Sequence, residues 1–184
     1  MNILALDTAT DVLSVALQVE DVLIETTRTG GYEHSERLVP VIQWLLAEGG
    51  ISFSDLNLIV YSRGPGSFTG LRIGAATAKG FSLGWYVPVV SIPTLDAYAY
   101  PHCFFPGAVV PLLDAKKRRY YSAVYTEVKR IGEYADISAE NLVSSLSAHE
   151  RVLFTGPGSI LLKERTDIET SGFSSAGKKD FTVK

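Results

Sequence analysis

The chain carries the segment SRGPGSFTGLR at residues 62–72, between its most apolar run, residues 56–61, and a stretch rich in small residues. This order predicts a buried strand, a glycine turn and the start of a helix. Gly64 and Gly66 permit positive φ and close backbone approach, and Ser67 or Thr69 can cap the helix. Free amides at such a helix start bind anions, but a plain structural turn has the same composition. The segment alone supports both interpretations.

Two common nucleotide-binding motifs are excluded for this segment. It lacks the lysine of a Walker-type phosphate loop, and its glycine spacing is not that of a dinucleotide fingerprint. Backbone amides at the helix start remain able to bind a phosphate.

Composition places the chain among ordinary globular proteins. Its 184 residues, 46% hydrophobic and 20% charged, suffice for one domain or two small lobes. The net charge of −3 argues that the protein does not bind nucleic acid by itself, so any role with RNA needs a basic partner. The single cysteine, Cys103, excludes an internal disulfide framework and fits a reducing compartment. Without a basic leader region or a long apolar stretch, we expect a cytoplasmic protein.

Hydrophobic periodicity predicts strands and helices along most of the chain. Residues 35–48 carry apolar side chains three and four positions apart, the spacing of a helix with one buried face. Gly74, Ala75 and Ala78 give a helix at residues 69–83 a smooth face, against which we expect another helix to dock closely. The other expectations are strands at 3–6, 12–18, 22–27, 55–61, 87–92, 109–113, 120–127 and 152–155, and short helices at 94–99 and 143–149.

Two features of the first half recur in the second half in the same order. An aspartate ends an apolar strand at Asp7 and again at Asp114, and the sequence GPGS follows a strand at residues 64–67 and 156–159. This repetition predicts a duplicated architecture of two related lobes, a layout typical of folds that hold a nucleotide in a cleft.

The predicted lobes differ in length. We expect an N-terminal lobe at residues 1–100 and a shortened C-terminal lobe at residues 108–184, separated by the loop at residues 101–107. The polar tail, residues 165–184, is expected to be weakly ordered in most of its length.

Several motifs together resemble one family. They are ILALDTAT at 3–10, HSERLVP at 34–40 and SRGPGSFTGLRIG at 62–74, with ATAKG at 76–80, VPVV at 87–90 and LLDAKK at 112–117. This combination resembles the TsaB family, also called YeaZ, over about residues 1–160. Members are bacterial partner subunits for making threonylcarbamoyladenosine in tRNA. The resemblance implies an α/β, actin-like and Hsp70-like (ASKHA, RNase H-like) fold of two related lobes.

The resemblance also implies partners. They are a paralogous catalytic subunit, TsaD, a P-loop ATPase, TsaE, and an enzyme that makes threonylcarbamoyl-adenylate. TsaD holds a metal with a His-x-x-x-His pair, whereas His34, His102 and His149 are far apart in this chain. We therefore expect no catalytic residue, no metal and no firmly bound cofactor. The implied role is a non-catalytic partner that forms a homodimer when alone, meets tRNA only through the complex and shares ATP or ADP at the partner interface.

An enzyme is the alternative hypothesis. It would be an actin-like ATPase or a glycoprotease-type peptidase, the activity named in older descriptions of this superfamily. A metalloprotease needs a metal-activated water, and the chain lacks the local ligand spacing for one.

The candidate site residues form two groups. The candidates for a phosphate loop are Asp7, Gly64, Gly66, Ser67, Gly156 and Gly158. Asp7 stands where actin-like folds place a carboxylate that orients a metal and phosphate, or it closes an Asx turn. The basic run at residues 116–119 would contact tRNA in a complex or form a solvated hairpin tip.

The second group is a candidate interface. It comprises His34, Leu38, Val41, Trp44, Arg72, Gly74, Ala75 and Ala78. Trp44 lies off the apolar stripe of its helix, so we expect it to be partly exposed, and exposed tryptophan favours an interface. Arg72 would meet a phosphate or a carboxylate, or form a surface ion pair. We expect self-association and partner binding to compete for this surface.

Overall fold

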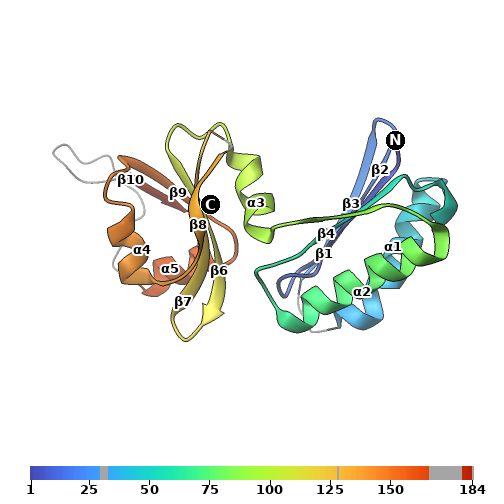
Figure 1. Ribbon diagram of the computed structural model, residues 1–184, viewed down its shortest axis with the longest axis horizontal. Coiled ribbons are helices and arrows are strands. Elements are labelled where there is room, and N and C mark those ends of the chain that lie inside the picture. Colours follow the sequence, from blue (N-terminus) through green and yellow to red (C-terminus); the bar gives the residue numbers. More distant parts are fainter. Residues whose placement is uncertain (30–32, 128, 166–179, 184) are drawn as a thin grey trace. The chain divides into compact units, whose positions relative to one another are not determined.

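A computed structural model describes residues 1–29, 33–127, 129–165 and 180–183 (Figure 1). The chain divides into two compact units, Met1–Thr94 and Leu95–Lys184. Each unit holds one five-stranded sheet. The sequence predicts a later boundary, at residues 101–107. In the structure, the helix at Thr94–Ala99 belongs mostly to the second unit.

The sheet of the first unit has the strand order β3-β2-β1-β4-β5. Strands β1 to β3 form the predicted antiparallel meander, and β4 and β5 continue the sheet in parallel with β1. The elements are β1 (Ile3–Asp7), β2 (Leu13–Val19), β3 (Val22–Arg28), α1 (His34–Glu48), the 3-10 turn η1 (Phe53–Asp55), β4 (Leu58–Ser62), α2 (Phe68–Trp85) and β5 (Val89–Ile92).

Helices α1 and α2 cover one face of this sheet (Figure 1). Strand residues alternate between faces, and Leu4, Leu6 and Leu17 point into the core beneath the helices. From α1, the predicted stripe supplies the buried residues Leu38, Ile42, Leu45 and Leu46. The buried face of α1 and the inward-facing strand residues therefore pack into one apolar layer. The helical and strand periods in the sequence predicted these two faces.

The second unit repeats this architecture. Its sheet runs β10-β9-β6-β7-β8, which is the order of the first sheet when each strand is matched to its counterpart. The elements are α3 (Thr94–Ala99), the 3-10 turn η2 (Tyr100–His102), β6 (Ala108–Lys116), β7 (Arg119–Thr126), β8 (Lys129–Ser138), α4 (Ala139–Ser145), β9 (Arg151–Thr155), α5 (Gly158–Arg165) and β10 (Asp180–Val183).

Both faces of the second sheet carry helices (Figure 1). One face packs against α4 and α5, through residues such as Leu142 and Leu162. The other packs against α3, where Leu95 and Ala99 contact Val109 and its neighbours. The second unit therefore has two apolar layers of its own.

The predicted repeat of two lobes is confirmed. The second sheet has as many strands as the first, although a shortened second lobe was expected. Both have five strands, and β10 pairs in parallel with β9, so residues 180–183 of the polar tail are part of the sheet. Residues 166–179 and 184 of that tail lie outside the described residues. Strand β8 and helix α5 are not among the predicted elements, and α4 begins at Ala139 rather than at residue 143. In the described part of the chain, no helix combines the length and apolarity needed to cross a membrane.

The buried layer of the first unit gives a direct stability test. Leu17 is fully buried on β2, whereas Leu23 on the adjacent strand β3 is 63% exposed. We expect Leu17→Ala to lower the free energy of unfolding by about 2–5 kcal/mol because it leaves a cavity. Leu23→Ala, the matched control, should change it by less than about 0.5 kcal/mol. Urea titrations measure both values, and equal effects would contradict this assignment of faces.

Candidate functional site

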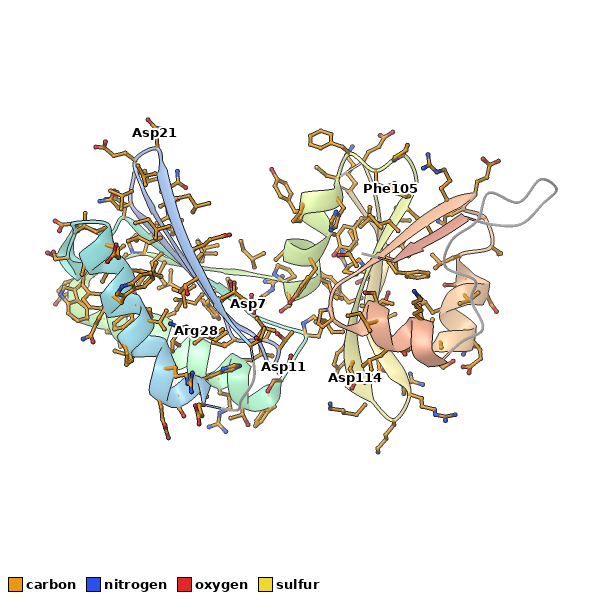
Figure 2. The ribbon with its side chains drawn as sticks, turned by 180° about the vertical axis from the view of Figure 1, so that it is seen from behind. Asp7, Asp11, Asp21, Arg28, Phe105 and Asp114 are labelled. Carbon is orange, nitrogen blue, oxygen red and sulfur yellow. The ribbon has the colours of Figure 1, made fainter. Side chains whose placement is uncertain are left out.

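Asp7 ends β1 and shapes the turn into β2 (Figure 2). Its Oδ1 accepts a hydrogen bond of 2.9 Å from the Ala9 amide. This is the Asx turn that the sequence analysis considered for the residue. Oδ1 therefore helps to hold the backbone of the β1–β2 turn.

The glycine loop between β4 and α2 packs directly on that turn. The Ser67 amide donates to the Ala9 carbonyl at 2.7 Å. A Cβ placed on Gly66 would lie only 2.3 Å from the same oxygen, so no other residue fits without moving backbone. Gly64 adopts φ +105°, a conformation that favours glycine. Gly66 and Ser67 thus contact the backbone of Ala9, whose amide is bonded to Asp7.

The amides at the start of α2 are partly used by the fold itself. The Ser67 side chain caps the helix, with its Oγ accepting from the Gly70 amide at 3.3 Å. Because Ser67 donates its own amide to Ala9, that N–H is not free for an anion. The local hydrogen bonds favour the structural interpretation of this loop.

The small residues of α2 pack against β1 and the turn after it. Thr8 is buried there, and its Oγ1 donates to the Gly70 carbonyl at 2.8 Å. A Cβ on Gly74 would lie 2.5 Å from the same Oγ1, and Ala78 lies in the core one turn further along. The expectation that Gly74 and Ala78 dock a partner helix is therefore wrong, since these residues are buried inside the first unit.

The second glycine loop reproduces the first. Gly156 adopts φ +80°, and Cβ atoms on Gly156 and Gly158 would each lie 2.8 Å from the Leu112 carbonyl oxygen on β6. The buried Ser159 donates from its Oγ to the Gly156 carbonyl at 2.7 Å. Gly156 and Gly158 therefore permit close approach to a strand, as Gly66 does in the first unit.

Asp114 is not the counterpart of Asp7. The first loop touches Ala9, two residues after Asp7, whereas the second touches Leu112, two residues before Asp114. Asp114 makes its own Asx turn, accepting at 2.9 Å from the Lys116 amide (Figure 2). Asp7 and Asp114 thus stand at different positions along the matched strands β1 and β6. The prediction that the two aspartates correspond is therefore wrong.

His34 begins α1 and is buried rather than exposed. Its Nε2 lies 2.8 Å from the Thr10 carbonyl, which can only accept, so Nε2 carries the proton and donates. This bond ties the start of α1 to the β1–β2 turn. His34 therefore has a structural partner within the first unit and does not belong to an exposed surface.

The exposed sides of α1 and α2 carry large apolar residues. Trp44 is 49% exposed, Phe68 74% and Leu83 69%. The Arg72 guanidinium lies 5.3 Å from the centroid of the Phe68 ring. We call Val39, Trp44, Phe68, Arg72 and Leu83 the helix surface.

Among the other predicted interface residues, Val41 and Ala75 are half-buried and Leu38 is fully buried in the core. Phe68 and Leu83 are not among the predicted interface residues. Their helical spacing from Arg72 indicates that they lie on the same side of the helix. Within the described ranges, no three His, Cys, Asp or Glu side chains gather closely enough to hold a metal ion.

The glycine contacts predict opposite effects for two substitutions in one helix. A Cβ on Gly70 would meet the Thr8 carbonyl oxygen at 2.0 Å, whereas nothing lies within 4 Å of a Cβ on Gly80. We expect Gly70→Ala to destabilise the protein by about 1–3 kcal/mol. Gly80→Ala should stabilise it by up to about 1 kcal/mol because alanine favours helix. Thermal unfolding measures both, and two effects of the same sign would contradict the packing described.

Comparison with known proteins gives consistent matches. The family model described as "TsaD: tRNA N6-adenosine threonylcarbamoyltransferase" matches residues 23–182. The tRNA threonylcarbamoyladenosine biosynthesis protein TsaB of Escherichia coli K12 is 36% identical over 154 residues, which are 83% of this chain and 66% of that protein. TsaB of Bacillus subtilis 168 is 31% identical over 181 residues, 94% of this chain and 79% of that protein.

A solved structure agrees with these matches. YeaZ from Pseudomonas aeruginosa superposes with a TM-score of 0.78 at 27% identity, over 88% of this chain and 78% of that one. The predicted fold class, an actin-like α/β fold of two related lobes, is confirmed. The chain spans about two thirds of the length of the E. coli relative and 59% of that of Haemophilus influenzae.

Proposed function

We propose, since the chain belongs to the TsaB (YeaZ) family, that it acts in the biosynthesis of threonylcarbamoyladenosine in tRNA. The observation that carries this proposal is the match to B. subtilis TsaB, which extends over 94% of this chain and 79% of that relative. The role is that of a partner subunit for a TsaD-like threonylcarbamoyltransferase.

The site contacts support a role without catalysis by this subunit. Asp7, Ser67 and His34, the polar candidates nearest the glycine loop, each bond to neighbouring backbone in the first unit. Asp7 Oδ1, the Ser67 amide and His34 Nε2 hold two turns and a helix together, which favours a structural role for these residues. The glycine loop then acts by positioning α2.

The helix surface supplies the contact with the partner. Exposed aromatic side chains and arginine are the residue types that contribute most binding energy at protein interfaces. Trp44, Phe68 and Arg72 supply them on the two neighbouring helices α1 and α2 (Figure 1). We propose that the same surface forms a homodimer when the partner is absent, so that the two associations compete.

The remaining partners proposed are those that the family resemblance implies. A TsaE-like P-loop ATPase joins the complex, and ATP or ADP is held where this chain meets its partner. The net charge of −3 disfavours an independent grip on RNA, so tRNA is contacted through the complex.

Loss of binding on substitution of Phe68 tests the partner surface. We expect Phe68→Asp to weaken binding to a TsaD-like subunit at least about tenfold, because it places a charge in an apolar contact. Phe104→Asp in the second unit is the matched control, since Phe104 is also a largely exposed phenylalanine and lies outside the helix surface. Calorimetry measures both affinities, and reconstituted tRNA modification followed by nucleoside mass spectrometry should fall only for Phe68→Asp.

Two results would contradict the proposal. Binding by Phe68→Asp and by Trp44→Ala that equals binding by the unaltered protein would exclude the helix surface. ATP turnover or proteolysis by the purified chain alone, abolished by Asp7→Asn, would instead establish an enzyme.

A further inference from the structure

The second unit contains a cavity of about 210 Å³ outside the regions discussed so far. Its walls come from α3 and η2, from β6, and from the region where β7 turns into β8. This is the end of β7 opposite the Asp114 turn. The lining combines apolar side chains, such as Ala99 and Val109, with a few charged groups, as small-molecule sites generally do.

Asp96 is held in a fixed orientation at this cavity. The hydroxyl groups of Tyr125 and Tyr134 both donate to its Oδ1, at 2.5 and 2.7 Å. Burial, together with the bond to Asp96, raises the pKa of Tyr125 above its usual range, so this hydroxyl stays protonated and donates. Within the described part of the chain, Oδ2 of Asp96 has no hydrogen-bond partner. The cavity thus has an oriented carboxylate oxygen with spare accepting capacity.

Arg130 provides the opposite charge. Its guanidinium lies 3.9 Å from the centroid of the Tyr134 ring and 3.7 Å from a carboxylate oxygen of Glu133. A guanidinium has five N–H donors, so Arg130 can bind a further carboxylate in addition to these contacts. Glu127 adds a second acidic group to the lining.

We propose that this cavity binds a free α-amino acid. The ammonium group donates to Oδ2 of Asp96 and the carboxylate accepts from Arg130, while Ala99 and Val109 line the space for a short side chain. Charge-assisted bonds at both ends select a zwitterion over a simple amine or a simple acid. This site is independent of the proposed function, because it involves neither the helix surface nor the glycine loops.

A titration of the complete chain tests this site. The probes are L-alanine, L-serine and L-valine, compared with ethanolamine, which lacks the carboxylate, and propionate, which lacks the ammonium group. We expect the amide NMR signals of Ala99, Val109 and Tyr125 to shift, with at least one amino acid binding about tenfold or more tightly than either comparator. No shift of these signals up to millimolar probe would overturn the proposal.

Matched variants separate the two charged contacts. Asp96→Asn keeps an oxygen for the two tyrosines but removes the charge, so amino acid affinity should fall about tenfold or more. Arg130→Gln should weaken amino acid binding while leaving ethanolamine binding unchanged. Glu150→Gln, an exposed position in the same unit, should change neither. If Asp96→Asn fails to fold, Arg130→Gln decides, and full amino acid affinity in that variant would overturn the proposal.

Discussion

The close approach of a glycine loop to the neighbouring strand, or to the turn that follows it, organises each half of this protein. In the first unit the loop before α2 touches Ala9, and in the second the loop before α5 touches Leu112. Both contacts leave less than 3 Å for a Cβ atom, so glycine is required by space. The position of the following helix, and of everything that α2 exposes, depends on this contact.

The same contact explains how a glycine loop of a kind that can bind anions has a structural role here. Its first helical turn is capped by Ser67, and the Ser67 amide is bonded to Ala9. His34 ties the start of α1 to the neighbouring carbonyl of Thr10. Both helices are therefore anchored at one turn of the sheet, and their outer sides carry the helix surface.

Much of this architecture could be predicted from the sequence. The stripe from Leu38 to Leu46 and the alternation in β2 have the periods of a helix and a strand, so local pattern was sufficient. Strand β8 was missed because it is a largely exposed edge strand, and its pairing with β7 depends on tertiary contact. The small residues of α2 correctly indicated a tight neighbour, but composition could not show that this neighbour is Thr8 rather than a helix.

Hydrogen exchange at the Ser67 amide tests the central claim, that the glycine loop is a structural contact and not a phosphate cradle. Because this amide donates to Ala9 at 2.7 Å, its exchange should be slow in the isolated chain and unchanged by added ATP. Fast exchange that slows only when ATP is added would contradict the account, since it would show an amide that is free until a phosphate binds.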